Sequence, residues 1–186
     1  GRDPLGWDDP LRVLVRAVEG FPAPVIAMME GSVWGGGCEL VMACDLLIAT
    51  PDVTLAITPA KIGVPYNISG MQTFLNAMPL PVVKEMLFTA QPIDADRALS
   101  VGMINHVVPA DEITAFTLEL AETMAARAPL SIAVMKAGLR VLAGADSVTP
   151  LMFERVEGLR RKAYESGDYE EGQRALSERR KPEFKG

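Results

Sequence analysis

A glycine-rich segment near the start of the chain has the residue types of a site for a negatively charged atom. It holds Gly31 and the run 35–37, and it lies between two apolar stretches, residues 25–29 and 38–44. The first N–H groups of a helix lack acceptors within that helix, and glycine lets a ligand approach them closely. The pattern fits a backbone oxyanion hole, in which N–H groups stabilise a carbonyl oxygen as it becomes negative. It also fits a structural turn whose glycines let a helix pack closely on a strand.

The same segment excludes two kinds of nucleotide site, and the rest of the sequence argues against a metal. The segment lacks the Lys-Ser/Thr pair of a phosphate-binding loop and the spacing of a dinucleotide site. His106 is the single histidine, and we expect it to be structural. Cys38 and Cys44, the two cysteines, would be separated on one helix by about 9 Å of rise, too far for a disulfide. We therefore expect reduced thiols, a cytoplasmic location and no metal.

The composition is typical of a globular protein. The chain has 186 residues, of which 49% are hydrophobic and 23% charged, with a net charge of −6. The negative charge argues against a nucleic-acid partner held by general electrostatics. No apolar run approaches the roughly 20 residues of a membrane helix, so we expect no membrane segment.

Hydrophobic periodicity predicts strands that alternate with helices in the first third of the chain and helices thereafter. This order is typical of an α/β fold with a parallel sheet. We predict two regions, a core at 1–110 and a helical region at 111–186. The predicted strands are 25–29, 46–49, 53–57 and 104–108, with a loop at 58–70. From Met71 onward helices dominate. The predicted helices are 11–18, 38–44, 81–90, 94–102, 111–127, 129–144, 148–165 and 169–180.

Three segments in the same order resemble the crotonase (enoyl-CoA hydratase/isomerase) superfamily. They are the glycine motif at 28–46, the segment 94–105 and the C-terminal run 180–184. The resemblance implies an α/β fold with a crotonase-like ββα spiral core, followed by an α-helical oligomerisation region that builds homotrimers or hexamers. It also implies that about the first 70 to 80 residues of the family domain precede residue 1, given the usual size of such domains.

The resemblance implies acyl-CoA chemistry, with the CoA thioester as substrate and no cofactor. In the superfamily, two backbone N–H groups hold the thioester oxygen and stabilise an enolate. Gly36 matches the donor at the start of the buried helix, and the other donor comes from a loop before residue 1. Gly35 and Trp34 are predicted substrate contacts beside it. Lys181 and Phe184 match a C-terminal region that contacts the CoA adenine and phosphates in relatives; the alternative there is a solvated helix end.

Two positions decide which reaction of the superfamily is expected. Hydratases use two glutamates around a water molecule, and Glu39 matches the first. The second position is Pro59, a predicted substrate neighbour that cannot move protons, so hydration by a glutamate pair is disfavoured.

A decarboxylase branch offers another chemistry. Residues 64–67, Val-Pro-Tyr-Asn, resemble the branch that decarboxylates methylmalonyl-CoA, in which the tyrosine contacts the substrate carboxylate. Tyr66 would hold that carboxylate out of the thioester plane, so that the breaking C–C bond overlaps the carbonyl π system. An apolar pocket of Trp34, Ile62 and Val64 would disfavour the carboxylate relative to CO2. Glu39 would then be catalytic, structural or a ligand for water, and the alternative for Tyr66 is a packing role.

The predicted function is a lyase that converts methylmalonyl-CoA or malonyl-CoA to propionyl-CoA or acetyl-CoA. Two alternatives stay open from the sequence. One is another crotonase activity, such as that of a hydratase or isomerase. The other is a non-catalytic acyl-CoA-binding or assembly subunit, which the missing second oxyanion donor favours if the chain is complete.

Overall fold

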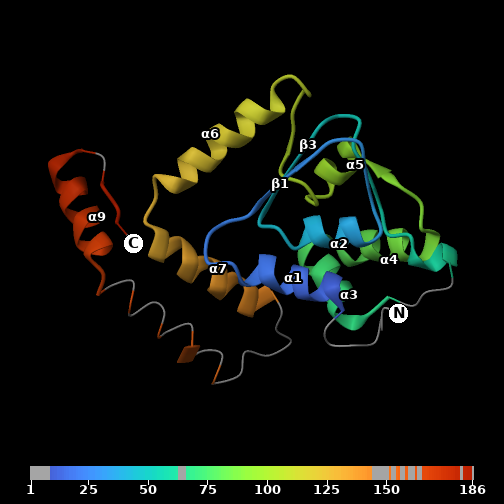
Figure 1. Ribbon diagram of the computed structural model, residues 1–186, viewed down its shortest axis with the longest axis horizontal. Coiled ribbons are helices and arrows are strands. Elements are labelled where there is room, and N and C mark those ends of the chain that lie inside the picture. The colour runs from blue at the N-terminus through green and yellow to red at the C-terminus, as the bar shows by residue number, and fades with distance from the viewer. Residues whose placement is uncertain are drawn as a thin grey trace. The chain divides into compact units, whose positions relative to one another are not determined.

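Two strands followed by a helix form the repeating unit of the first part of the chain (Figure 1). In the computed structural model, residues 9–62, 66–143, 165–180 and 182–185 are described, together with the single residues 151, 154, 155, 158 and 162. The first unit consists of β1 (Ile26–Met29), β2 (Ser32–Trp34) and α2 (Gly36–Met42); the second consists of β3 (Leu46–Ala49), β4 (Thr54–Ala56), the 3-10 helix η1 (Pro59–Ile62) and α3 (Ile68–Ala77).

Successive strands enter two different three-stranded sheets. One sheet has the order β1-β3-β6, with β6 at His106–Val107, and all its neighbours are parallel. The other has the order β2-β4-β5, with β5 at Ile93–Asp94 antiparallel to β4. Each ββα unit thus adds one strand to each sheet, which produces a spiral rather than a single layer.

Side chains set the ends of the parallel pairs. Asp45 accepts a hydrogen bond from the Val25 N–H at 2.7 Å, and its own N–H donates to the Val25 carbonyl at 2.9 Å. Asn105 similarly accepts from the Leu47 N–H at 2.8 Å and donates its N–H to the Leu47 carbonyl at 2.9 Å. These polar groups extend the ladder beyond the strands and oppose a slip in register.

The remaining helices begin with residues that are typical of helix starts. Asp9 caps α1 (Pro10–Gly20) and Asp94 caps α5 (Ala95–Ser100), each through its side-chain oxygen. Proline lies in the first turn of α4 (Leu80–Thr89), and α7 (Pro129–Ala143) begins with proline. The other helices are α6 (Ile113–Ala125) and α9 (Gly167–Glu178).

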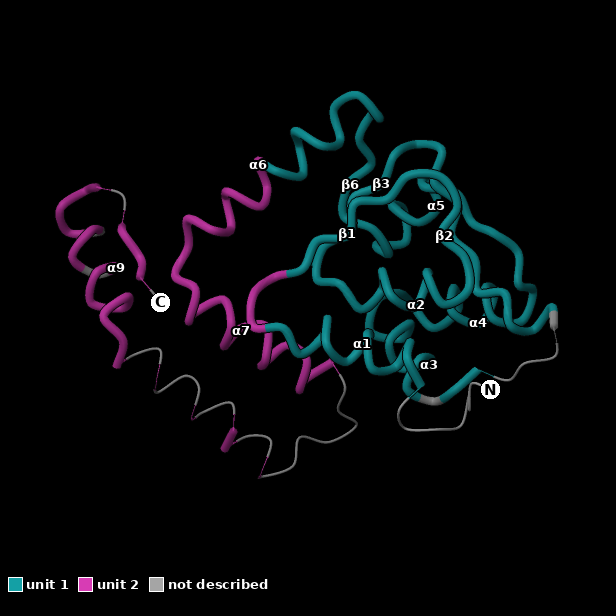
Figure 2. The backbone as a smooth tube through the Cα atoms, in the orientation of Figure 1, with its two compact units in different colours: residues 1–21, 25–118 teal, residues 22–24, 119–186 magenta. Residues whose placement is uncertain are grey.

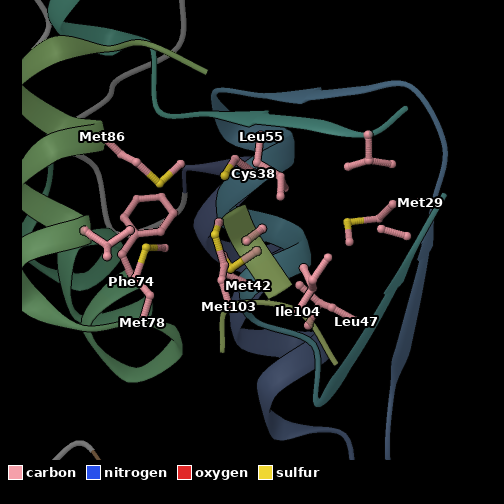
Figure 3. Close-up of a cluster of buried hydrophobic side chains, with 14 of the residues drawn as sticks. Met29, Cys38, Met42, Leu47, Leu55, Phe74, Met78, Met86, Met103 and Ile104 are labelled. Carbon is pink, nitrogen blue, oxygen red and sulfur yellow. The ribbon is translucent and has the colours of Figure 1, made fainter. Parts of the chain in front are cut away.

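The hydrophobic core lies around α2. On one side of it, Figure 3 shows Phe74 of α3, Met86 of α4 and Met78, which directly follows α3; on the other side it shows Met29 and Leu47 of the strands. Cys38 and Met42 project from α2 between these groups (Figure 3). The packing of this core therefore determines where the glycine-rich start of α2 and the start of α3 lie.

The chain forms two compact units, coloured in Figure 2: residues 1–21 with 25–118, and residues 22–24 with 119–186. The first unit holds both sheets and α1 to α5. The second holds α7 and α9, and within it the Lys136 ammonium donates to the Ala23 carbonyl at 3.0 Å. The division predicted from the sequence, 1–110 and 111–186, stays a prediction. Within the described residues, no helix combines the length and apolar character needed to cross a bilayer.

The predicted α/β class and the four predicted strands are confirmed, with small shifts at their ends. Two expectations were wrong. Strand β2 lies inside the segment predicted as a glycine-rich turn, and α3 begins at Ile68 inside the predicted loop 58–70. Most of the predicted helix at 148–165 lies outside the described residues.

We expect Leu55→Ala to lower the free energy of unfolding by about 3 kcal/mol, because it removes a fully buried side chain from the core. Leu80→Ala is the matched control, since Leu80 is 51% exposed and should cost less than about 0.5 kcal/mol. Urea denaturation followed by circular dichroism measures both. Equal losses in the two variants would contradict this account of the core.

Candidate active site

The turn between β2 and α2 exposes the start of the helix. Gly35 has φ +59° and ψ −124°, a conformation that favours glycine, and its N–H donates to the Ala56 carbonyl of β4 at 2.8 Å. Its carbonyl accepts from the N–H groups of Cys38 and Glu39. This geometry starts α2 at Gly36, whose N–H is among those that have no acceptor within the helix. The structure therefore places Gly36 where a backbone oxyanion donor is expected.

One turn into the same helix, a carboxylate lies inside the protein. Glu39 is 2% exposed. A buried carboxylate is costly unless a donor reaches it, and the Tyr66 hydroxyl donates to Glu39 Oε2 at 2.5 Å. Two residues that were predicted separately, 27 positions apart, thus form one hydrogen-bonded pair.

Tyr66 is held by the residues that follow it. Asn67 is the N-cap of α3, and its Oδ1 accepts from the Gly70 N–H at 2.7 Å. The Tyr66 ring lies against Phe74 one turn further along, with ring centroids 5.3 Å apart. On another side it lies against Gly70, where a side-chain carbon would be 2.3 Å from Tyr66 Cε1. The phenol is therefore fixed by the helix start as well as by Glu39.

The pair changes the acidity of its surroundings. Burial, followed by the hydrogen bond to Glu39, raises the pKa of the Tyr66 phenol well above its usual range. Burial and then the Glu39 charge raise the pKa of the Cys38 thiol to about 12, although a hydrogen bond to the Ala56 backbone opposes them. Tyr66 is thus a neutral hydrogen-bond donor at physiological pH, and Cys38 is a neutral thiol.

The other predicted residues of this unit lie on the neighbouring strand and on η1. Trp34 is 49% exposed on β2, and its indole N–H donates to Thr54 Oγ1 at 3.2 Å. Pro59 begins η1 and is half-buried, and Ile62 ends it. Val64 lies outside the described residues. The structure brings Glu39 and Tyr66 together, whereas the apolar pocket of Trp34, Ile62 and Val64 stays a prediction.

In the second unit, a buried carboxylate binds two arginine side chains. Glu171 is 8% exposed. Arg180 binds it through two nitrogens, at 2.5 and 3.0 Å, and Arg174 at 2.5 Å. Arg180 turns back because Arg179 has φ +54° and the Arg180 N–H donates to the Ala175 carbonyl at 3.1 Å, which ends α9. Arg180, the first residue of the C-terminal run that resembles the superfamily, is therefore engaged by Glu171 and also by Glu178.

Glu171 and a second buried carboxylate, that of Asp168, also bind backbone N–H groups of the C-terminal residues. The Glu183 N–H donates to Glu171 Oε1 at 3.0 Å, and the Lys185 N–H donates to Asp168 Oδ1 at 2.7 Å. Phe184, predicted to contact CoA, is half-buried, with one ring carbon 3.7 Å from where a side-chain carbon on Gly172 would lie. Lys181 lies outside the described residues. A pocket of about 550 Å³ opens beside α9, lined by both acidic and basic side chains.

Among the described residues, no three histidine, cysteine or carboxylate side chains come together as metal ligands require. Cys38 is buried, Cys44 is half-buried, and neither is in a disulfide. His106 lies edge-on against Phe116, with ring centroids 5.0 Å apart.

The sequence pattern of the enoyl-CoA hydratase/isomerase family matches residues 7–186. The chain belongs to this family. The resemblance of the glycine motif to the crotonase superfamily is thereby confirmed, and Gly36 and Glu39 lie on the helix that carries the motif.

Individual members of the enoyl-CoA hydratase/isomerase family differ in their sequence identity to this chain. The chain is 50% identical over 186 residues to methylmalonyl-CoA decarboxylase of Escherichia coli (strain K12), which covers all of this chain and 71% of that protein. It is 34% identical over 165 residues to carnitinyl-CoA dehydratase of Proteus mirabilis (strain HI4320), covering 88% of this chain and 63% of that protein. The chain thus spans roughly two thirds of the length of these relatives.

Solved structures of the family share the fold. A crystal structure of methylmalonyl-CoA decarboxylase complexed with 2S-carboxypropyl-CoA matches with a TM-score of 0.76 and 49% identity, covering 100% of this chain and 71% of that one. An enoyl-CoA hydratase of Bacillus anthracis matches with a TM-score of 0.82 and 29% identity, covering 95% and 67%. The ββα spiral is therefore common to members with different reactions, and the reaction must be argued from the site.

Sequence reasoning missed Asn67 and Gly70 as parts of the site. Asparagine is among the strongest N-cap residues, so Asn67 could have indicated a helix start directly after Tyr66. Glycine within a helix costs about 1 kcal/mol relative to alanine, so Gly70 suggested a loop instead of a helix.

We expect Glu39→Gln to lower the pKa of Tyr66 while leaving it above the usual tyrosine range. Glutamine keeps an acceptor for the hydroxyl but removes the negative charge that disfavours the phenolate, and burial of the ring remains. Titration of tyrosine ring carbons by NMR measures the change. The exposed Tyr169 is the internal control, and an unchanged Tyr66 titration would contradict the assigned role of Glu39.

We expect Glu171→Gln to speed hydrogen exchange at the Glu183 amide by about tenfold or more, because neutral glutamine binds the arginines and this amide less well. Glu170→Gln is the matched control, since Glu170 is an exposed neighbour on α9. Arg180, Arg174 and the Glu183 N–H lower the pKa of Glu171 far below its ordinary value of 4.5. Wild-type protection should therefore be complete above pH 4.5 and be lost as the pH falls through the lowered pKa. Equal exchange in both variants would show that Glu171 does not hold the C-terminal residues.

Proposed function

We propose that this protein is a carboxy-lyase that decarboxylates methylmalonyl-CoA to propionyl-CoA, or malonyl-CoA to acetyl-CoA. The observation that carries the proposal is the part-buried hydrogen bond from Tyr66 to Glu39, together with proline at position 59. This arrangement presents a phenol next to the carboxylate and lacks the second glutamate of a hydration site. The 50% identity to methylmalonyl-CoA decarboxylase of Escherichia coli supports it.

The chemical step needs a place for negative charge rather than a strong base. The bond between the α-carbon and the carboxylate breaks, CO2 leaves, and the electron pair moves into the thioester as an enolate. The Gly36 N–H donates to the enolate oxygen, where the charge develops. A proton from water then adds to the α-carbon and gives the acyl-CoA product.

Tyr66 and Glu39 act on the carboxylate that is lost. The phenol has one hydrogen, which Glu39 accepts in the structure. Rotation about the C–O bond turns this hydrogen toward a substrate carboxylate, which is then oriented perpendicular to the thioester plane. Glu39 is then without its donor and beside a second negative charge, a cost that lasts only until the carboxylate leaves as neutral CO2 and the hydroxyl turns back to Glu39, so the pair favours the loss of CO2.

The binding partners follow from this chemistry. Acyl-CoA is the substrate, no further cofactor takes part, and Phe184 with Lys181 contacts the CoA moiety. The helices of the second unit assemble the protein into homotrimers or hexamers, and the reduced cysteines Cys38 and Cys44 accord with a cytoplasmic location.

A second candidate function is hydration or isomerisation of an enoyl-CoA. Glu39 favours it, because one buried carboxylate at this helix can act on a proton by itself. The similarity to carnitinyl-CoA dehydratase is compatible with that reaction. Incubation with methylmalonyl-CoA, malonyl-CoA and crotonyl-CoA, followed by mass spectrometry, separates the candidates. Hydration of crotonyl-CoA without release of CO2 would overturn the proposal, and binding of all three without turnover would indicate a non-catalytic subunit.

We expect Tyr66→Phe to lower kcat/KM for decarboxylation of methylmalonyl-CoA by about tenfold or more, because the ring stays while the hydroxyl that orients the carboxylate is lost. Tyr169→Phe is the matched control and should keep wild-type activity, since Tyr169 lies on α9 in the other unit. Steady-state release of CO2 measures both. An unchanged kcat/KM in Tyr66→Phe would remove Tyr66 from the mechanism.

A further inference from the structure

We infer that Gly70 is a positioning residue, whose missing side chain in the first turn of α3 lets the Tyr66 ring lie where its hydroxyl reaches Glu39. The inference deepens the proposed function, and its kinetic part rests on that function. Its structural part stands on the contacts around Gly70 and is tested separately.

Both partners of the hydrogen bond lie against Gly70. A side-chain carbon built there would be 2.3 Å from Tyr66 Cε1, 2.9 Å from Tyr66 Cδ1 and 3.0 Å from Glu39 Oε1. Carbon atoms pack favourably at about 3.5 to 4.0 Å, so an alanine at this position cannot coexist with the present position of the ring. The same space is open at another helical glycine: apart from the adjacent residues and the backbone of its own helix, no described atom lies within 4 Å of a carbon added at Gly20.

The backbone of α3 is not free to move away from the ring. The Asn67 side chain holds the Gly70 N–H at 2.7 Å, and the Asn67 carbonyl accepts from the Met71 N–H at 3.0 Å. One turn later, Phe74 is completely buried and also contacts the Tyr66 ring. A new methyl group must therefore displace the tyrosine ring rather than the helix.

The glycine is not explained by backbone conformation. Gly70 lies within α3 and is absent from the positions with positive φ. Alanine is the better helix former, so local structure alone would favour it here. What glycine supplies is the space next to the hydroxyl-bearing ring, and that space determines where the Tyr66 donor points.

The test compares Gly70→Ala with Gly20→Ala, and combines Gly70→Ala with Tyr66→Ala. We expect Gly70→Ala to lower kcat/KM for methylmalonyl-CoA by about tenfold, with most of the loss in kcat, while Gly20→Ala stays within about twofold of wild type. In the Tyr66→Ala background the ring is gone, so adding Gly70→Ala should cost less than about twofold. Wild-type kcat/KM in Gly70→Ala, or the same fold loss in both backgrounds, would overturn the inference.

A readout besides activity separates this inference from the proposed function. NMR titration of the tyrosine ring carbons should show a lower pKa for Tyr66 in Gly70→Ala, because the ring leaves the buried position beside Glu39. This result with an inactive wild type would support the role of Gly70 and reject the decarboxylase. A wild-type Tyr66 titration in Gly70→Ala would reject the role of Gly70, whatever the activity.

Folding of the variants provides one more distinction. Should Gly70→Ala fail to fold, the double variant with Tyr66→Ala is expected to fold again, because removal of the ring restores the space for the methyl group. Recovery of the native circular dichroism spectrum by the double variant supports the inference. Continued failure to fold would show that Gly70 serves the helix itself, and would overturn it.

Discussion

The site depends on one constraint, which is that the buried carboxylate of Glu39 must have a hydrogen-bond donor. Glu39 lies inside the protein because α2 is the central helix of the core (Figure 3). The donor is the Tyr66 hydroxyl, and it reaches the carboxylate because α3 starts immediately after Tyr66 and packs against α2. The turn at Gly35 serves the same arrangement, since it starts α2 at Gly36 and so places the Gly36 N–H, the proposed oxyanion donor, and the carboxylate one turn apart on the same helix.

This pairing accounts for how one fold of the enoyl-CoA hydratase/isomerase family accommodates different reactions. A glutamate that is free to exchange protons with water can serve hydration. A glutamate that accepts a hydrogen bond from a half-buried phenol, with proline where a second glutamate is expected, instead forms a polar pair suited to orienting a carboxylate. In the proposed mechanism, the N–H groups at the start of α2 stabilise an enolate charge. On that proposal, the side chains near the start of α2, rather than the fold, decide the reaction.

In the second unit, buried carboxylates likewise have hydrogen-bond donors, and some of these donors are positively charged. Glu171 and Asp168 are largely buried, and arginine side chains and backbone N–H groups of the C-terminal residues supply their donors. Arg180, itself exposed, is consequently part of an ion-pair network with the buried Glu171 and the exposed Glu178. Its charge holds the end of the chain to α9, so the basic composition of this segment by itself is a poor indicator of a phosphate contact.

The sequence by itself determined the α/β class, the strands with apolar runs, the helix that follows the glycine motif, and the family. These features depend on local periodicity and on residues that are close along the chain. It did not show β2, because three residues beside glycines are too few for a periodic pattern and pair with β4 only in the folded chain. It also missed the start of α3, because helix propensity opposed Gly70, whereas the close approach of the Tyr66 ring requires glycine there. Only the tertiary structure decided that Glu39 and Tyr66 meet, because a hydrogen bond between residues 27 positions apart depends on how α2 and α3 pack. The same holds for Arg180, whose partner Glu171 becomes its neighbour only when the chain turns back at Arg179.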